Sequence, residues 1–425
     1  MKQYIILLAA SFLLGACSKD NNDSAPGPKQ DAERTMLVYM AAENNLSRGF
    51  ADEDLREMKA GSKQLSDRQN LIVYVDQAET KTPYIARIKD GVLVDSVAME
   101  ETLTADPALL EKMLRYTREH YPAQSYGLVL WGHASGWLVH NDSVAYARSR
   151  AYGGDTGNNS KSSSGKYWMN ITSMARAIAN GMGSAHLRYI FADCCNFLCV
   201  ESAYELRNVC DYLIGSPAEI PDPGAPYDLI VPKLFGTSEN FYQAIVDTYY
   251  DHYLEEIKKR PDYYFNDVYG DLEGYSVPLS VVKSSELENL AQATASLLNS
   301  IPDKLAPDGD FTLNQVIYYG YSSSSKYAYD IYDALKRNTP ESNFSQWEPY
   351  LLKAIPYSRN SAKWLTGFPQ LVHDMYVFSV MSKDNYRALS MYFPQRAYNS
   401  TTPNWNTVIR NFQWNSVIRW QQYGW

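Results

Sequence analysis

The chain has 425 residues, of which 45% are hydrophobic, and this fits one large α/β domain with insertions or two to three smaller domains. A disordered or fibrous protein is excluded, because enough apolar side chains are present to fill a core. The formal net charge is -9 at pH 7, and no long run of Lys or Arg occurs. These features argue against nucleic acid and anionic membrane surfaces as main partners and favour a cationic ligand or peptide.

The first residues indicate export. Lys2 precedes the apolar run YIILLAASFLL, which is too short to span a bilayer comfortably, and the following LGAC ends in Cys17. LGAC resembles the bacterial lipobox, in which signal cleavage leaves the cysteine as a lipidated first residue. We therefore predict a signal peptide over 1–16 and acyl chains on Cys17 that anchor the protein to the periplasmic or surface face of a bacterial outer membrane. A cleaved signal peptide without lipid is the alternative. Residues 17–33 are polar, with Pro and Gly, and predict a flexible tether.

Strand and helix patterns then alternate. Buried strands are predicted for TMLVYMAA, NLIVYVDQ, YGLVLWGH and HLRYIFADCC. Helices are predicted for SRGFADEDLREMKAG behind a Ser47 cap, for DPALLEKMLRYTREHY with Asp106 as cap and Pro107 next, and for ITSMARAIANGM. YIARIKDGVLVDSVA alternates around Lys-Asp-Gly and predicts a hairpin. The order of strand, helix and strand predicts an α/β fold with a mostly parallel sheet flanked by helices.

Residues 139–168 interrupt this alternation. They are rich in Gly, Ser and Asn and contain Arg148, Arg150, Lys161 and Lys166. We predict an exposed, mobile loop. The SGK in this segment is not a phosphate-binding loop, because the first glycine of that motif is missing.

The pattern becomes Tyr-rich and more helical in the second half. NFYQAIVDTYYDHYLEEIKK and SSELENLAQATASLLNSI predict amphipathic helices. The regularly spaced tryptophans of NWNTVIRNFQWNSVIRWQQYGW predict packing on the main domain, with a carbohydrate or membrane surface as the alternative. We predict a core over 34–235 and a C-terminal, mainly helical extension over 236–425 that packs on it.

Four cysteines follow the lipobox, at Cys194, Cys195, Cys199 and Cys210. If the segment after Cys195 is helical, Cys199 and Cys210 lie too far apart along one helix for a disulfide. We therefore expect no disulfide scaffold, and at least one cysteine that is retained for reactivity.

Two predicted strands end in reactive side chains. His133 follows LVLWG, and Cys195 follows FADC. Because parallel strands end at one edge of a sheet, the two side chains are expected to meet there. An imidazole beside a thiol is the minimum for nucleophilic catalysis. Cys195 also precedes the predicted helix NFLCVESAYEL, whose dipole would lower the pKa of the thiol. The alternatives are a histidine packed in a turn and a buried, inert cysteine.

Four stretches in order resemble the clostripain family of cysteine peptidases, which belongs to the caspase-like group. They are VYMAAENNL, LVLWGHASGW, FADCCNFLCVESAYELRNVCDYLIGSPAEIPDPGAPY and ALSMYFP. The resemblance covers residues 35–230 and is thinner afterwards. It implies a caspase-like fold and hydrolysis of protein or peptide substrates. It assigns His133 as general base or acid and Cys195 as nucleophile, and Glu201, six residues later, selects this cysteine over its neighbours.

The resemblance also implies how substrate is held. The oxyanion would be bound by the backbone N–H groups of Ala134 and Cys195. An acidic pocket would accept Arg or Lys before the scissile bond, with Asp193 as one acid and Glu219 or Asp222 as a second. The alternative for Asp193 is a cap of the following helix. No cofactor or metal is expected, while a calcium requirement, the choice between Arg and Lys, and the oligomeric state are left open.

Two departures from the family pattern bear on activity. The family usually has Gly at the position of Ala134 and Ala at the position of Cys194. If position 134 needs a positive φ, alanine is strained there and the oxyanion site is distorted. A catalytically inactive, peptide-binding surface homologue is therefore the main alternative, and another acyl-transfer or hydrolase chemistry by the same two residues is a third.

Self-activation is a further implication of the resemblance. Members of this family are often zymogens that cut themselves after a basic residue downstream of the histidine. Arg148 and Arg150 are the candidate sites, and Lys161 and Lys166 are weaker ones. The alternative is an ordinary loop that its basic residues keep soluble.

Overall fold

The computed structural model describes residues 32–47, 49–78, 81–139, 151–157, 167–259, 274–320, 326–366, 371–374, 386–401 and 403–425. These residues belong to one compact unit. The predicted signal peptide, Cys17 and most of the predicted tether lie outside the described residues. Within the described ranges, no helix combines the length and apolar character that crossing a membrane requires.

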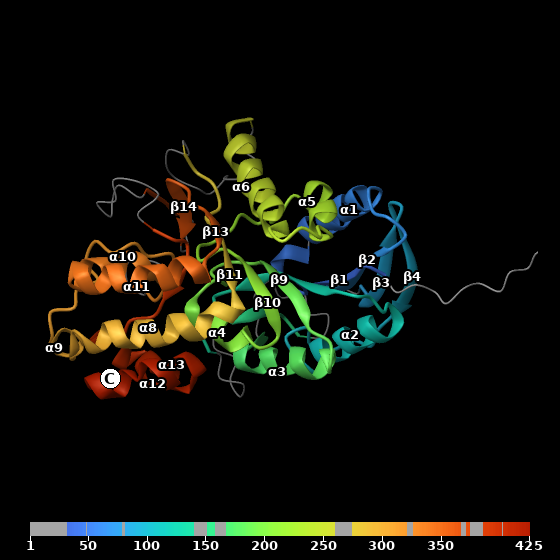
Figure 1. Ribbon diagram of the computed structural model, residues 1–425. Helices are drawn as coiled ribbons and strands as arrows, with labels where there is room; N and C mark the ends of the chain where they lie inside the picture. The colour runs from blue at the N-terminus through green and yellow to red at the C-terminus, as the bar shows by residue number, and fades with distance from the viewer. Residues whose placement is uncertain are drawn as a thin grey trace, which may run out of the picture. The chain divides into compact units, whose positions relative to one another are not determined.

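A nine-stranded sheet forms the centre of the part that the structure describes (Figure 1). Its strands are β1 (Arg34–Ala42), β2 (Gln69–Gln77), β3 (Tyr84–Lys89), β4 (Val92–Ala98), β5 (Tyr126–Trp131), β9 (Leu187–Asp193), β10 (Cys210–Gly215), β11 (Leu279–Lys283) and β13 (Tyr357–Arg359). The order is β13-β11-β10-β9-β5-β1-β2-β3-β4. The five strands from β10 to β2 are parallel, and the outer strands on both sides are antiparallel. The predicted α/β fold is confirmed.

Helices cover both faces of this sheet (Figure 1). They include α1 (Phe50–Ser62), α2 (Pro107–His120), α3 (Ile171–Met182), α4 (Val200–Leu206), α5 (Tyr227–Leu234), α6 (Phe241–Lys259) and α8 (Leu287–Asn299). Helices α1, α5 and α6 share one core with one face of the sheet, and α2, α3, α4 and α8 share another core with the opposite face. In β1, Leu37 and Tyr39 point into the second core, and Met36 and Val38 into the first. Burial on both faces explains why TMLVYMAA is almost continuously apolar.

Two local sequence signals predicted their elements correctly. The Asp106 side chain accepts a hydrogen bond from the Ala108 N–H at 2.9 Å and caps α2. In the hairpin of β3 and β4, Asp90 and Gly91 have φ of 50° and 85°, as a two-residue turn between twisted strands requires.

The predicted Ser47 cap of α1 is wrong. Ser47 ends a short 3-10 turn, η1 (Asn45–Ser47), and the cap position belongs to Gly49 with φ 91°. Glycine adopts this positive φ without a steric penalty. The chain therefore turns once more before the helix begins.

A three-stranded sheet includes part of the segment for which a loop is predicted. It consists of β6 (His133–Ala134), β7 (Tyr152–Asp155) and β8 (Tyr167–Met169), in that order. The prediction of an exposed loop over all of 139–168 is therefore wrong for 151–157, where all but the last residue are buried. Arg148, Arg150, Lys161 and Lys166 lie outside the described residues.

The second half of the chain adds to the sheet as well as covering it, because it supplies β11 and β13. Its other elements are α9 (Pro302–Leu305), α10 (Ile331–Asn338), α11 (Glu341–Ala354), α12 (Trp405–Val408), α13 (Gln413–Ile418), β12 (Tyr329–Asp330), β14 (Lys363–Thr366), β15 (Leu371–Asp374) and β16 (Ser390–Met391). Trp414 and Trp420 are at most 1% exposed, and the Gln413 N–H donates to Glu205 at 2.6 Å. These tryptophans are therefore buried, and the segment that carries them contacts α4 through Glu205.

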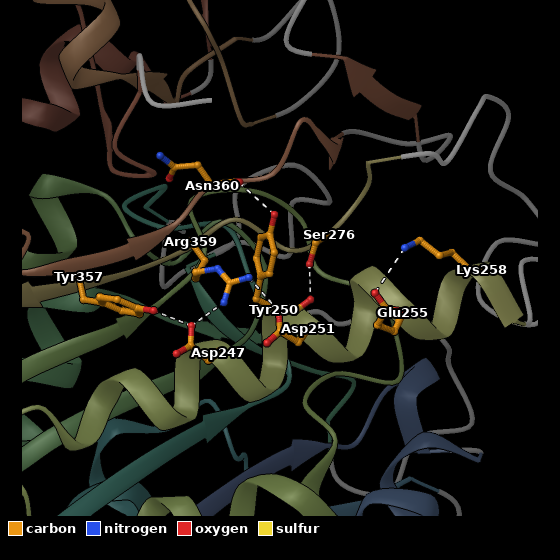
Figure 2. A network of polar contacts seen from close by, with 9 residues as sticks. All are labelled: Asp247, Tyr250, Asp251, Glu255, Lys258, Ser276, Tyr357, Arg359 and Asn360. Atoms are coloured by element: carbon orange, nitrogen blue, oxygen red, sulfur yellow. Dashed lines mark hydrogen bonds and ion pairs between the residues drawn. The ribbon is translucent and has the colours of Figure 1, made fainter. Parts of the chain in front are cut away.

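A network of hydrogen bonds and ion pairs joins helix α6 to the edge strand β13 of the sheet (Figure 2). Arg359 of β13 donates to Asp247 at 2.6 Å and to Asp251 at 2.8 Å, both on α6. The Tyr250 hydroxyl, also on α6, donates to the Asn360 carbonyl at 3.0 Å. These contacts fix the helix whose inner face reaches the site described next.

Candidate active site

The two predicted reactive strand ends lie at the same edge of the sheet. Strands β5 and β9 are parallel neighbours, with Trp131 opposite Asp193. His133 and Cys195 each follow two residues after this pair. Both line one pocket of about 20 Å³, which we call the dyad pocket. Its lining is Leu46, Trp131, Gly132, His133, Asp193, Cys195, Ile220, Pro221, Asp222 and Gly224.

Burial distinguishes the four described cysteines, and no disulfide joins them. Cys194 is fully buried in the core that contains α2 and α3, whereas Cys195 is partly exposed and packs against the opposite core. Neighbouring residues of an extended chain point to opposite sides, which explains this division. Cys199 and Cys210 are also buried. Among the described cysteines, solvent therefore reaches Cys195 best.

The predicted helix directly after Cys195 is wrong. Helix α4 begins at Val200, with Cys199 as its cap and the Cys199 sulfur accepting from the Ser202 N–H at 3.5 Å. Cys195 itself lies in a turn, so no helix dipole acts on it directly. Cys199 and Cys210 therefore belong to different elements, and the single helix invoked to separate them does not exist.

The surroundings of Cys195 raise the pKa of its thiol and so favour the protonated form. Burial raises its pKa, and the negative charge of Glu219 raises it further, with smaller contributions from Asp222 and Asp193. A hydrogen bond from the Ile220 N–H to the sulfur, at 3.5 Å, opposes these effects only in part. The expectation of a lowered pKa is therefore wrong for this conformation.

Replacing Glu219 tests this electrostatic account. Glu219→Gln removes the largest charge acting on the thiol, so we expect iodoacetamide to alkylate Cys195 about threefold faster at pH 7. Peptide mapping by mass spectrometry quantifies the modified Cys195. The control is Glu288→Gln, because Glu288 lies on α8 and no charge from it acts on the thiol. Equal rates in Glu219→Gln and the unmodified protein would refute the account.

His133 is oriented by a residue that the sequence analysis missed. Its Nε2 lies 2.8 Å from the Oδ1 of Asn45, at the start of η1. Because an amide oxygen only accepts hydrogen bonds, Nε2 carries the proton. The other ring nitrogen, Nδ1, is then the atom that can accept a proton. Asn45 lies in VYMAAENNL, and this stretch was the only signal that could have found it.

Ala134 does not have the strain that was considered for it. The glycines on either side, Gly132 and Gly136, have φ of 136° and 64°, whereas Ala134 is not among the residues with positive φ. At Gly136, a Cβ would lie 2.6 Å from the Asn196 carbonyl oxygen, so glycine is needed there. The substitution of Gly by Ala at position 134 is therefore compatible with the backbone. The assigned oxyanion role of Ala134 stays a prediction.

Asp193 lines the dyad pocket, and three hydrogen-bond donors hold its carboxylate. It is 3% exposed. Its Oδ2 accepts from the Ala225 N–H at 3.1 Å and the Tyr227 hydroxyl at 2.8 Å, and its Oδ1 accepts from the Tyr249 hydroxyl at 2.9 Å. Burial raises the pKa of Asp193, and these hydrogen bonds oppose the rise. The alternative of a cap for the following helix is wrong, because α4 is capped by Cys199.

The two other predicted pocket acids occupy different places. Asp222 is exposed and lines the dyad pocket with Asp193. Glu219 is half-buried and is not among the lining residues, but its charge acts on Cys195.

A fourth acid, Asp54 of α1, was missed by the sequence analysis. It is 2% exposed, and its Oδ2 accepts from the Trp131 indole N–H at 2.5 Å. Burial raises its pKa, and the charge of Asp193 adds to the rise. Asp54 thus holds Trp131, which lines the dyad pocket, through this hydrogen bond. Its position in a helix rich in acidic residues gave no signal of burial.

The family of the chain follows from comparison with known proteins. The model of the clostripain family matches residues 38–414. The chain belongs to the clostripain family. Clostripain of Hathewaya histolytica is 24% identical over 388 residues, which cover 77% of this chain and 71% of that protein. The resemblance to the clostripain family is therefore confirmed.

Two solved structures of C11 proteases share the fold. A secreted protease from Bacteroides thetaiotaomicron, in complex with an irreversible peptide inhibitor, has 27% identity and a TM-score of 0.71, covering 92% of this chain and 99% of that one. An inactive zymogen from Parabacteroides distasonis has 26% identity and a TM-score of 0.70, with the same coverage. The clostripain family fold thus extends over nearly the whole chain.

Proposed function

We propose that this clostripain family member is a cysteine endopeptidase that cleaves after Arg or Lys, with His133 and Cys195 as its catalytic residues. The observation that carries the proposal is the dyad pocket, which His133, Cys195 and Asp193 line together. The solved relatives support it, because both are C11 proteases and one of them is a cysteine protease in complex with an irreversible peptide inhibitor.

The chemistry needs only these side chains and backbone amides. His133 takes the thiol proton, and the Cys195 sulfur attacks the carbonyl carbon of the substrate. The backbone N–H groups of Ala134 and Cys195 stabilise the oxyanion of the tetrahedral intermediate. His133 then returns the proton to the leaving amine, and a water molecule that His133 deprotonates hydrolyses the acyl-enzyme. Because burial and Glu219 raise the pKa of the Cys195 thiol, the transfer of its proton to His133 has to accompany the attack of the sulfur.

Specificity for a basic side chain is supported by charge. Asp193, Asp222 and Glu219 surround or approach the dyad pocket, and the formal net charge of the chain is -9. A pocket of about 20 Å³ holds little more than one water molecule. An Arg or Lys side chain that reaches the dyad pocket would lie beside Asp193 and Asp222.

The contact between Asn45 and His133 gives a prediction for catalysis. Asn45→Ala removes the acceptor for Nε2–H, so the ring loses its fixed tautomer and orientation. We expect kcat to fall about tenfold, the value of one hydrogen bond of about 1.4 kcal/mol, with little change in KM. Steady-state kinetics with an Arg peptide measures both constants. Asn45→Asp keeps an acceptor and is expected to retain most of the activity, and loss of activity in both variants with KM raised would point to a merely structural role.

Export and processing complete the proposal. We propose that the chain is exported and anchored through lipid on Cys17, and that it activates itself by cleavage after Arg148 or Arg150. The relative from Bacteroides thetaiotaomicron is secreted and the one from Parabacteroides distasonis is a zymogen, which supports both ideas. Intact-mass measurement of active protein tests the second: two chains are expected, and fully active uncut chain would refute self-processing.

A peptide-binding homologue without activity is the second candidate. The raised pKa of Cys195 and the small dyad pocket favour it, because both describe a site that is not ready for catalysis. Another reaction by the same dyad, acyl transfer or hydrolysis of a different substrate, would show reactivity toward thiol reagents without peptide cleavage.

A mixed peptide library separates these candidates. The protein and its Cys195→Ala variant are incubated with the library, and mass spectrometry maps the cleaved bonds. Cuts confined to bonds after Arg or Lys, absent in Cys195→Ala and present in the control Cys210→Ala, are the expected result. No cuts by either protein, even after trypsin nicks the segment 141–166, would favour the inactive homologue.

A further inference from the structure

Helices α8 and α11 pack side by side in the second half of the chain (Figure 1). Trp347 of α11 joins them, because its indole N–H donates to the Thr294 hydroxyl of α8 at 2.9 Å. Between the two helices lies a groove of about 530 Å³, which we call the helical groove. Its lining residues come from 289–300 and 343–350, and the dyad pocket shares none of them.

The polar side chains of the helical groove are amides and hydroxyls. Asn289 and Gln292 belong to α8, and Asn343 and Gln346 belong to α11. Residues three apart lie on one face of a helix, so each helix presents its two amides together. None of the described residues that line the groove is charged, although the formal net charge of the chain is -9. An amide offers both donors and an acceptor, which matches the hydroxyl groups of a neutral ligand.

Tyr350 places an exposed aromatic ring beside these amides. It is 42% exposed and lies one helical turn after Gln346 on α11. A ring with an apolar face and a polar tip can stack on the C–H face of a sugar while its hydroxyl stays in water. The C-terminal tryptophans, for which a carbohydrate surface was the alternative, do not offer such a ring at Trp405, Trp414 or Trp420, because these three are buried.

We propose that the helical groove binds a neutral oligosaccharide. The sugar hydroxyls form hydrogen bonds with the four amides, and one sugar ring stacks on Tyr350. The volume of the groove lies within the range of about 300–1,000 Å³ that is usual for ligand sites. A polypeptide partner fits less well, because the centre of a protein interface is apolar and rich in aromatic residues, whereas amides and hydroxyls dominate here.

Hydrogen bonds within the helices prepare two of the amides for a ligand. The Gln292 Nε2 donates to the Glu288 carboxylate at 3.0 Å, and the Gln346 Nε2 donates to the Ser342 carbonyl at 3.1 Å. These bonds restrict flexible side chains, so less conformational entropy is lost when a sugar binds. The negative charge of Glu288 beside the groove also disfavours an acidic sugar.

A glycan array tests the proposal. The purified, labelled protein is applied to an array of neutral and acidic oligosaccharides on a carrier protein. Isothermal titration calorimetry with the free glycan that gives the strongest signal then measures Kd and stoichiometry. We expect binding of neutral glycans with one site per chain. Cys195→Ala is expected to bind them equally, because the helical groove and the dyad pocket have no lining residue in common.

Variants assign the binding to the helical groove. Tyr350→Ala and, separately, Gln292→Ala are expected to weaken glycan binding by about tenfold. Tyr167→Ala is the matched control, because Tyr167 is a similarly exposed tyrosine, on β8, that does not line the groove, and it should leave Kd unchanged. Circular dichroism establishes that each variant is folded.

Four results would overturn the proposal. They are the absence of binding to every neutral glycan of the array, tighter binding of acidic glycans, unchanged binding in folded Tyr350→Ala or Gln292→Ala, and equal binding to the carrier protein alone. The last of these would indicate a polypeptide partner instead of a sugar.

Discussion

His133→Ala is expected to lower kcat/KM for peptides with Arg before the scissile bond by about 10⁴-fold, with the fold intact. Without the imidazole, nothing removes the proton from a thiol whose pKa is raised by burial and by Glu219. His133 is partly exposed, so its truncation leaves no cavity in the core. Initial rates on a fluorogenic Arg peptide measure the loss, and thermal unfolding checks the fold.

His186→Ala is the matched control for this prediction. His186 is exposed and forms an ion pair with Asp211 at 3.2 Å, away from the dyad pocket. We expect it to keep activity within about twofold, because exposed ion pairs contribute little. If His133→Ala kept activity within about tenfold of the unmodified protein, His133 would be a packing residue of the turn.

Asp193→Asn is expected to remove the preference for a basic side chain. Loss of one charge-assisted contact to a desolvated guanidinium is worth about 2–5 kcal/mol, so kcat/KM for an Arg peptide should fall by about 30-fold or more. A peptide with citrulline in place of Arg has nearly the same shape without the charge, and its kcat/KM should change far less. The ratio of the two kcat/KM values is therefore the measurement.

The same substitution also tests the structural role of Asp193. Its carboxylate holds Ala225, Tyr227 and Tyr249, so an amide leaves at least one of these donors unsatisfied at a cost of about 1–3 kcal/mol in the free energy of unfolding. Urea denaturation measures that cost. Asp222→Asn changes an exposed position. It should lower the ratio of kcat/KM for the Arg peptide to kcat/KM for the citrulline peptide less than Asp193→Asn does, and leave the free energy of unfolding unchanged. An unaltered ratio of Arg to citrulline in folded Asp193→Asn would show that Asp193 only supports the pocket wall.

Periodicity predicted the layered fold because most elements carry their own signal. TMLVYMAA is buried on both faces as β1, and Asp106 begins α2 through a hydrogen bond that its residue type favours. The start of α4 was missed because its cap is Cys199, a residue type without cap preference. Strand β7 was missed because its Gly-Gly pair is typical of loops, and its pairing with β6 and β8 is a tertiary contact.

The sequence predicted the residues of the candidate site that directly follow strands. It did not predict the contacts that other segments of the chain make with them. His133 and Cys195 follow neighbouring parallel strands, β5 and β9, and the carboxyl ends of such strands lie at the same edge of the sheet. Both residues were therefore expected in one pocket, and both line it. The pKa of Cys195 could not be predicted, because burial and Glu219, which lies on another segment, decide it. The contact of Asn45 with His133 and the burial of Asp54 depend in the same way on packing that no local pattern records.

Covalent trapping of the nucleophile tests the central claim most directly. The protein is incubated with a peptide that carries a thiol-reactive electrophile directly after Arg, or after citrulline in a parallel sample, and mass spectrometry locates the modified residue. The account predicts one adduct per chain, on Cys195, formed at least about tenfold faster with the Arg peptide. An adduct on Cys194, Cys199 or Cys210, or equal labelling of Cys195 by both peptides, would contradict a dyad of His133 and Cys195 beside an acidic pocket.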